Sequence, residues 1–242
     1  MHATYSFNFL KTVSEQLIAE LDAMRITQLS PQTLQALKAF QKEKKAQQGV
    51  YVVHYDNRPV YLGKAQNVGG RLEMHLKKLT GRDNIDLTKV GYKALLLDKS
   101  MGTAANESLL ISIFRQTHEG MWNGEGFGPK DPGKRRDTTE PSTFDRDHPI
   151  KDQWPISSIP DQTTVGTVLK SMKKQLPYVL RYKVGAREAA PVDLTGVRRT
   201  AREILQAVVT ALGPGWKGVV LSHGMILYET NASYPYGQEL LP

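Results

Sequence analysis

One short stretch of the sequence gathers side chains that could bind an anion and move a proton. Tyr51, Tyr61 and Lys64 lie in two short runs rich in valine and tyrosine, and Arg71 and His75 follow four residues apart. Side chains four residues apart lie on one face of a helix. Each residue alone has a plainer interpretation, since tyrosine is favoured in strands and a helical arginine or histidine is most often solvated or packed. The combination favours chemistry.

Two predicted strands and a helix must position these side chains. Residues 49–55 and 59–63 have strand composition, and the polar turn at residues 56–58 separates them, which predicts a β-hairpin. From residue 68 the apolar positions change to helical spacing, at Leu72, Leu76 and Leu79. A hairpin that carries two tyrosines and a lysine is therefore expected beside a helix that carries arginine and histidine.

A second helix is predicted over residues 101–118, and Glu107 is the only carboxylate in its apolar pattern. Burying a single acid is costly unless the acid is paired or holds a cation, which makes Glu107 a candidate metal ligand. Alternatively, Glu107 lies exposed on the polar side of this helix with Asn106.

The order of these motifs resembles that of the GIY-YIG nuclease superfamily. Its members carry Gly-Ile-Tyr and Tyr-Ile-Gly on adjacent strands, then a helical arginine, and on a later helix a metal-binding glutamate that an asparagine often follows. The corresponding residues here are Tyr51 in Gly-Val-Tyr, Tyr61 in Tyr-Leu-Gly-Lys, Arg71 with His75 beyond it, Glu107 and Asn123. Valine and leucine in place of isoleucine keep the apolar volume of the motifs.

The resemblance implies hydrolysis of phosphodiester bonds, with a role for each matched residue. Glu107 would hold one divalent cation, Mg²⁺ or Mn²⁺ in its place, because hard cations suit carboxylate and phosphate oxygens. Arg71 would bind the scissile phosphate, and Tyr61 would orient phosphate or water. Asn123 would be a supporting hydrogen-bonding residue.

The general base has two candidates. Tyr51 is the usual base of the family, yet a free phenol titrates near ~10 and is a poor base at neutral pH. Lys64 and the metal could both favour the phenolate. His75 is an alternative base or phosphate donor, since imidazole titrates near ~6.5. The sequence does not choose between Tyr51 and His75.

A loop rich in glycine and proline follows Asn123 and contains Lys130, Lys134, Arg135 and Arg136. Glycine and proline this closely spaced disfavour both helix and strand, and the basic residues suit guanine or phosphate. The loop contacts DNA or is simply a surface loop. Together with the preceding Asn, its Pro-Gly and Arg-Arg-Asp sequence resembles the type II restriction endonuclease branch of the superfamily.

That narrower resemblance implies a sequence-specific double-stranded DNA endonuclease of a restriction-modification system. Type II enzymes commonly form homodimers because their sites are two-fold symmetric. A cognate DNA methyltransferase is expected in the same system, though not as a binding partner. The alternatives are a repair or mobile-element nuclease of the same superfamily and a DNA-binding module without catalysis.

Composition agrees with a globular protein that binds a polyanion. The chain has 242 residues and a net charge of +8, with lysine and arginine in recurring clusters. It has no cysteine, which excludes disulfides and thiolate metal sites. No apolar run approaches the ~18 residues of a membrane span, and no signal peptide is evident, so an intracellular, bacterial cytoplasmic location is expected.

The predicted fold is α/β in the α+β sense, in three parts. Residues 1–48 form a helical arm, with helices over residues 9–24 and 31–45, that grips DNA, meets a second subunit or simply packs. Residues 49–136 form the catalytic core, a small and mainly antiparallel three-stranded sheet flanked by helices. Residues 137–242 form a linker and a C-terminal αβ extension packed on the core. Asp145, Asp147 and His148 could be a metal cluster, but the neighbouring prolines disfavour it.

Overall fold

The computed structural model describes residues 8–98, 105–128 and 131–242. The chain is of mixed α/β class, as predicted, with mostly antiparallel sheets. It forms two compact units, of which the first comprises Met1–Lys77 and Asp86–Gly124 and the second Lys78–Ile85 and Glu125–Pro242. No helix in the described ranges is long and apolar enough to cross a membrane.

The first unit is built on an antiparallel sheet with strand order β1-β4-β2-β3. Its strands are β1 (Thr27–Gln28), β2 (Gly49–Tyr55), β3 (Arg58–Ala65) and β4 (Val90–Leu96). The strands predicted over residues 49–55 and 59–63 are confirmed as β2 and β3, and the two-residue β1 adds an edge that no sequence pattern indicated. Asp56 and Asn57 join β2 to β3 with φ angles of 51° and 63°, a left-handed turn that Asp and Asn tolerate.

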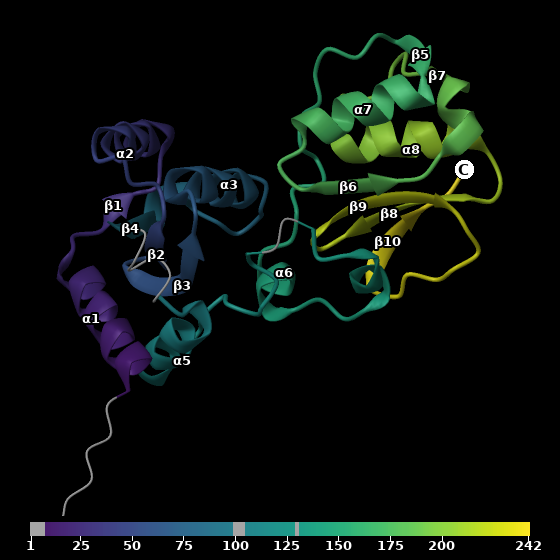
Figure 1. Ribbon diagram of the computed structural model, residues 1–242. Coiled ribbons are helices and arrows are strands. Elements are labelled where there is room, and N and C mark those ends of the chain that lie inside the picture. The colour runs from purple at the N-terminus through teal and green to yellow at the C-terminus, as the bar shows by residue number, and fades with distance from the viewer. Residues whose placement is uncertain (1–7, 99–104, 129–130) are drawn as a thin grey trace, which may run out of the picture. The chain divides into compact units, whose positions relative to one another are not determined.

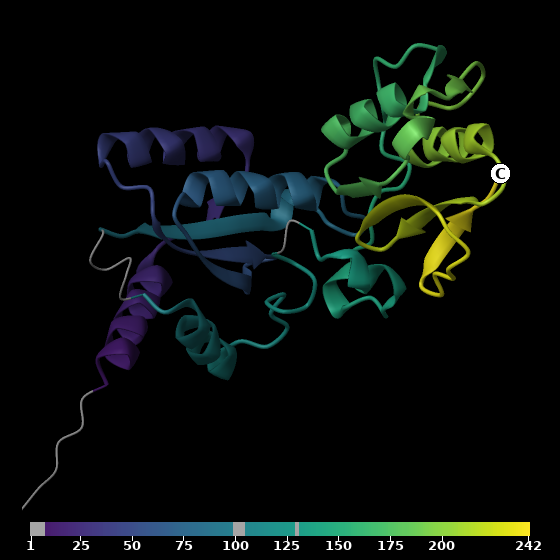
Figure 2. The ribbon, with the colours of Figure 1, turned by 45° about the vertical axis from the view of Figure 1, so that its right-hand side comes forward.

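Helices cover both faces of this sheet (Figure 2), with α2 and α3 on one side and α1 and α5 on the other. The helices are α1 (Phe9–Ala23), α2 (Pro31–Glu43), α3 (Val68–Thr80) and α5 (Glu107–Thr117), and the short 3₁₀ turn η1 (Leu87–Lys89) precedes β4. The predicted α1, α2 and α3 are confirmed. The helix predicted over residues 101–118 is confirmed from Glu107, and residues 101–104 lie outside the described ranges.

Side-chain caps fix where these helices begin. Ser30 and Thr33 form a reciprocal capping box in front of α2, whose first residue is Pro31. Asn106 accepts a hydrogen bond from the Leu109 amide at 3.0 Å, so α5 begins at Glu107.

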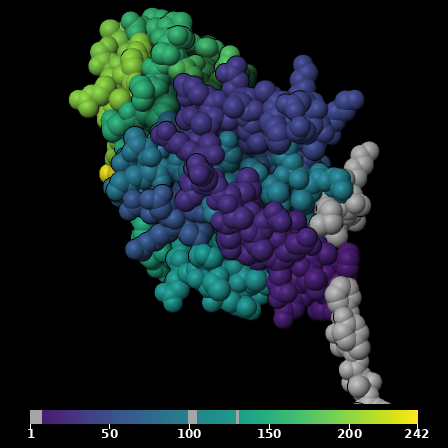
Figure 3. Space-filling view, turned by 90° about the vertical axis from the view of Figure 1, so that its left-hand side faces the viewer, coloured from purple at the N-terminus to yellow at the C-terminus, as the bar shows by residue number. Residues whose placement is uncertain are grey.

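The strand alternation of β2 divides its side chains between the two faces of the sheet. Val50 and Val52 belong to the apolar core that also contains Leu17 of α1 and Leu110 and Phe114 of α5. Side chains alternate along a strand, so Tyr51 faces the opposite side, where α3 lies. The face of α1 and α2 that is turned to solvent is seen in purple in Figure 3.

The second unit has its own sheet, with strand order β10-β8-β9-β6 and β6 parallel to β9 (Figure 1). The sheet consists of β6 (Val179–Tyr182), β8 (Trp216–Leu221), β9 (Gly224–Glu229) and β10 (Gly237–Leu240). A separate pair is formed by β5 (Gln162–Thr164) and β7 (Pro191–Asp193).

Helices α7 (Val165–Gln175) and α8 (Ala201–Leu212) cover this second sheet and supply much of its apolar core. The remaining elements are short: α6 (Thr143–Asp147), η2 (Lys134–Thr138) and η3 (Gly185–Ala189). Arg82 and Asp145 form an ion pair at 3.0 Å inside this unit, with both side chains almost fully buried. Asp145 is therefore a structural carboxylate.

Candidate active site

Two tyrosines and a histidine form one buried cluster in the first unit. Tyr51 of β2 and Tyr61 of β3 lie beside His75 of α3, and all three are buried. The Tyr51 Oη and His75 Nε2 atoms are 2.9 Å apart, which is hydrogen-bond distance. The Tyr61 ring meets His75 edge-on, with 5.1 Å between ring centroids. The hairpin and α3 thus bring together the residues that the sequence predicted to lie side by side.

Gly63 makes room for this cluster. It is the cross-strand partner of Tyr51, whose ring lies across it. A Cβ atom at position 63 would lie 2.6 Å from Tyr51 Cζ and 2.9 Å from Tyr61 Cε1, closer than packed carbon atoms tolerate. The packing of the two tyrosines therefore requires glycine at position 63, the glycine of Tyr-Leu-Gly.

Arg71 lies one helical turn before His75 and hydrogen-bonds both Tyr51 and Tyr61. Burial by itself lowers the pKa of the Arg71 guanidinium, but these bonds more than offset that effect, so its pKa is raised. Burial raises the pKa of the Tyr51 phenol, and Tyr61 and Glu107 raise it further, while Arg71 lowers it only in part. Tyr51 therefore keeps its proton at neutral pH.

The chemistry of the three side chains gives these hydrogen bonds a direction. A guanidinium has only donors, so Arg71 donates to the Tyr51 oxygen. The Tyr51 hydroxyl keeps its own proton and can donate it to His75 Nε2, which lies 2.9 Å away, in the neutral tautomer whose Nε2 carries no proton. In that tautomer the hydrogen bonds run in order from Arg71 through Tyr51 to His75.

Glu107 lies at the first position of α5 and is exposed. This is the plainer of the two sequence-based alternatives, in which it lies beside Asn106. Its Oε1 atom accepts a hydrogen bond from the Lys64 backbone amide at 3.2 Å, which ties the carboxylate to the end of β3. Since the charge of Glu107 acts on the pKa of Tyr51, the carboxylate lies close to the cluster.

The Lys64 side chain contacts the segment in front of α5. Its Nζ atom donates to the Ala105 carbonyl at 2.8 Å and so holds the segment in front of α5 against β3. The groups that shift the pKa of Tyr51 are Tyr61, Arg71 and Glu107, together with burial. Lys64 thus positions Glu107 through both its backbone and its side chain.

Asn123 is buried and uses both ends of its amide on β3. Its Oδ1 accepts from the Leu62 amide at 3.0 Å, and its Nδ2 donates to the Leu62 carbonyl at 2.8 Å. The Trp122 amide adds a bond to the Val60 carbonyl at 2.6 Å. The segment after α5 thereby covers the free edge of β3, and Asn123 acts as a positioning residue.

A divalent cation could bind at this site through the single carboxylate of Glu107. Within the described ranges, no group of three or more histidine, cysteine, aspartate or glutamate side chains could hold a metal ion. Mg²⁺ often binds through one or two carboxylates, with waters and substrate phosphate oxygens completing its shell. The exposed carboxylate of Glu107 fits that arrangement. Asp145 does not contribute a site, because it is paired with Arg82.

The predicted DNA-binding loop lies in the second unit, where its basic residues differ in their surroundings. Arg136 donates to Ser142 Oγ at 3.1 Å and approaches Asp145 Oδ2 at 3.4 Å, so it is engaged within the protein. Arg135 is exposed. Lys134 Nζ lies 4.9 Å from the centroid of the Tyr228 ring. Lys130 lies outside the described residues.

Lys134 also lines a hollow of about 620 Å³ that the sequence did not reveal. Basic and aromatic side chains share its wall, namely Lys183, Arg187, Trp216, Tyr228 and Tyr234. These residues come from segments far apart in the chain, so no local spacing marks them. Basic and aromatic groups together suit a phosphate backbone and stacked bases.

No protein-family model matches this chain, and no curated protein matches it in sequence.

Proposed function

We propose that this protein is a metal-dependent, sequence-specific double-stranded DNA endonuclease of the type II restriction class, built on a GIY-YIG-like core. The hydrogen-bonded series from Arg71 through Tyr51 to His75 is the observation that carries the proposal. The series joins a guanidinium, a phenol hydroxyl and an imidazole by hydrogen bonds, and the charge of Glu107 acts on the phenol. Hydrolysis of a phosphodiester needs groups of these kinds.

The buried pair suggests how Tyr51 works although its pKa is raised. A tyrosine that keeps its proton is no base by itself. When a water attacks phosphorus, its proton passes to the Tyr51 oxygen while the Tyr51 proton passes to His75 Nε2, which leaves an imidazolium. Tyr51 and His75 would thus act as one base, and the two sequence-based candidates become partners.

Arg71 and Tyr61 would bind and orient the phosphate, since Arg71 carries a fixed positive charge and donates hydrogen bonds in a planar fork. A bound Mg²⁺, or Mn²⁺ in its place, would offset charge on the phosphate and stabilise the leaving 3′ oxygen. Glu107 would hold that ion. Lys64 and Asn123 would fix the positions of Glu107 and β3.

Duplex DNA is the proposed substrate because basic groups recur in both units and the net charge is +8. Lys134 and the hollow that it lines would meet DNA from the second unit, with Arg135 exposed nearby in sequence. Arg136 would be available only if DNA displaced it from Asp145.

The proposed restriction activity implies a homodimer in the bacterial cytoplasm, beside a DNA methyltransferase that protects the host DNA. Several large apolar side chains of the first unit are exposed in the single chain: Phe9, Leu10, Met24, Ile26 and Phe40. A contiguous apolar patch marks a protein interface, so these residues are the candidates for contacts between two copies.

Replacement of Glu107 tests the metal assignment. Glu107→Ala should abolish Mg²⁺-dependent cleavage of duplex DNA and leave DNA binding largely intact in a gel-shift assay. Glu119→Ala is the matched control, because Glu119 is also an exposed carboxylate close to α5. If Glu107→Ala cleaves as fast as the control, Glu107 does not hold the catalytic ion.

A DNA-binding module without catalysis is the second candidate. The exposure of Glu107 and the absence of a multi-residue metal group from the described ranges favour it. Under this alternative the purified protein shifts duplex DNA but leaves it intact with Mg²⁺ or Mn²⁺. A repair or mobile-element nuclease would instead cleave at a branched structure or one long site rather than at a short palindrome.

A further inference from the structure

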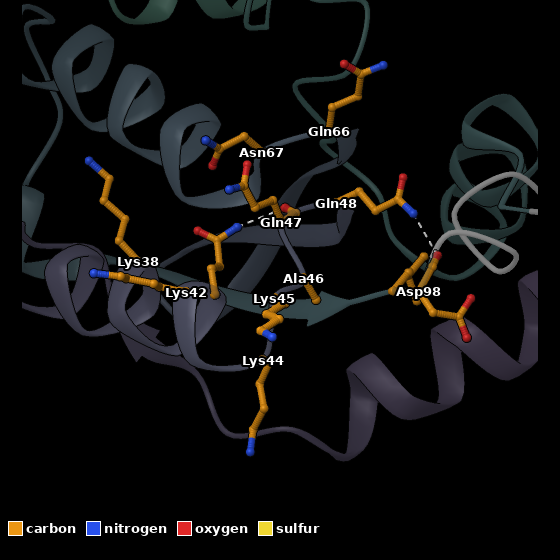
Figure 4. A pocket seen from close by; sticks show the side chains of 12 residues that line it. Lys38, Lys42, Lys44, Lys45, Ala46, Gln47, Gln48, Gln66, Asn67 and Asp98 are labelled. Atoms are coloured by element: carbon orange, nitrogen blue, oxygen red, sulfur yellow. Dashed lines mark hydrogen bonds between the residues drawn. The ribbon is translucent and has the colours of Figure 1, made fainter.

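A second basic surface lies in the first unit, around a groove of about 840 Å³ (Figure 4). Four lysines at the end of α2 line it together with side-chain amides from the segments that flank β2 and α3. We call it the lysine groove and define it by Lys38, Lys42, Lys44, Lys45, Gln48, Gln66 and Asn67. In Figure 4 the lysines spread out from α2, and the amides lie across from them.

The backbone beneath the groove is firmly held. Gln41 is buried, and its Nε2 donates to the Gln47 carbonyl at 2.8 Å. The same carbonyl accepts from the Val68 amide at 2.9 Å, which fixes the start of α3. Gly69 leaves room for the Gln41 side chain, because a Cβ there would collide with it. These contacts fix the shape of the groove floor.

Lys45 has an unusual backbone for its residue type. It follows the end of α2 with a φ angle of 52°, in the left-handed region. Glycine or asparagine usually occupies such a position after a helix, because a side chain is strained there. Strained residues persist most often at functional sites. A lysine here suggests that the charge matters more than the local conformation.

The positive charge of the groove is only partly balanced, although Asp98 also lines it. Lys38 pairs with Glu73 at 2.8 Å, and Lys44 pairs with its neighbour Glu43 at 2.8 Å. In the part of the chain that the structure describes, neither Lys42 nor Lys45 forms an ion pair. Two exposed ammonium groups beside several amide donors suit phosphate oxygens.

The position of the groove relates it to the candidate active site. Gln66 and Asn67 line the groove and lie between Lys64 and Arg71 in the sequence. Asn67 and Arg71 are four residues apart at the start of α3, or about 6 Å along a helix axis. Successive phosphates of one DNA strand advance about 3.4 Å along the duplex, so a strand bound at Arg71 reaches the groove within a few nucleotides.

We propose that the lysine groove binds the sugar-phosphate backbone of duplex DNA that flanks the scissile phosphate. The proposal rests on the proposed function, because it takes Arg71 as the site of cleavage. Lys42 and Lys45 contact phosphates, and the groove amides donate hydrogen bonds to them. Such contacts add affinity for every sequence alike and set the register of DNA without reading its bases.

The test is the double variant Lys42→Gln, Lys45→Gly, bound to a mixed-sequence duplex at several salt concentrations. Glycine at position 45 relieves the backbone strain, so the variant should fold at least as well as the wild type. Loss of two phosphate contacts should lower affinity about ten-fold or more near ~0.1 M salt and reduce the slope of log K against log salt by about 2.

The matched control is Lys11→Gln, Lys89→Gln, which removes the same charge from the same unit outside the groove. If the groove variant binds with the affinity and salt slope of this control, the groove proposal is wrong, even if the wild type cleaves DNA. If the wild type binds through the groove but never cleaves, the groove stands as a duplex-binding surface and the nuclease proposal fails. If the wild type does not bind duplex DNA, both proposals fail.

Discussion

In the proposed mechanism Tyr51 and His75 act as a general base only together. The raised pKa of Tyr51 would make it useless as a free base, and His75 is buried. The Tyr51 Oη and His75 Nε2 atoms are 2.9 Å apart. Tyr51 could therefore accept a proton from water while its own proton is transferred to His75. Residue types and spacing predicted that these side chains meet, but not which atom holds the proton.

Tyr51→Phe and His75→Gln should each lower the single-turnover cleavage rate by about 10²–10⁴-fold, the usual contribution of proton transfer, with little effect on DNA binding. Because burial raises the pKa of the Tyr51 phenol, the wild-type rate should show no rise from phenol ionisation near pH ~10. A His75→Gln variant that cleaves as fast as the wild type would contradict the relay.

The positions of the Tyr51 and Tyr61 rings depend on glycine at position 63. Gly63→Ala should displace Tyr51 and Tyr61, because the new methyl group would lie 2.6 Å from Tyr51 Cζ. We expect cleavage to fall by about 10²-fold or more, as misplacement by about 1 Å can cause, while DNA binding is retained. Wild-type cleavage by Gly63→Ala would show that the tyrosines need not lie where the structure has them.

His54 makes the first unit sensitive to acid. Burial, with a smaller contribution from the charge of Lys93, lowers the pKa of the His54 imidazole from 6.5 to about 4. The unfolded chain therefore binds more protons than the folded chain between these values, and stability falls as pH falls from about 6.5 to about 4. Thermal unfolding at several pH values should show this decline, and His54→Gln should flatten it. An equally steep decline in the variant would assign the sensitivity to other groups.

At the scale of elements, the sheet of the first unit depends on the segment that covers its edge. Asn123 bonds both backbone groups of Leu62 and so closes the outer edge of β3. β3 carries Tyr61, Gly63 and Lys64, which makes this edge part of the support of the candidate site.

Asn123→Leu should leave the amide and carbonyl of Leu62 without partners and lower the free energy of unfolding by about 2–4 kcal/mol. Cleavage should fall too, because β3 loses its support. Urea unfolding followed beside the cleavage assay checks both effects. If the variant is as stable as the wild type yet inactive, Asn123 acts on the substrate directly.

Local patterns predicted the elements well and the contacts between them poorly. The valine and tyrosine runs, the 3.6-residue period and the Ser30-Pro31 cap each lie within a few residues, so β2, β3, α2 and α3 were foreseen. The pairing of Asn123 with Leu62 spans 61 residues and left no mark in the sequence. The lysine groove joins residues 38–48 to residues 66–67, and only the first of these stretches shows its clustered lysines in the sequence.

At the scale of the whole molecule, the basic groups fall into both compact units. The catalytic candidates and the lysine groove belong to the first, and Lys134 with its aromatic hollow belongs to the second. Each unit by itself therefore offers a basic surface that suits a phosphate backbone.

Digestion of a plasmid and a phage genome by the purified full-length protein with Mg²⁺, followed by sequencing of the fragment ends, tests the central claim most directly. We predict discrete fragments whose ends share one short palindromic sequence, and no cleavage when the metal is chelated. Intact DNA under conditions in which the protein still shifts a duplex, or cleavage that persists without a divalent cation, would contradict it.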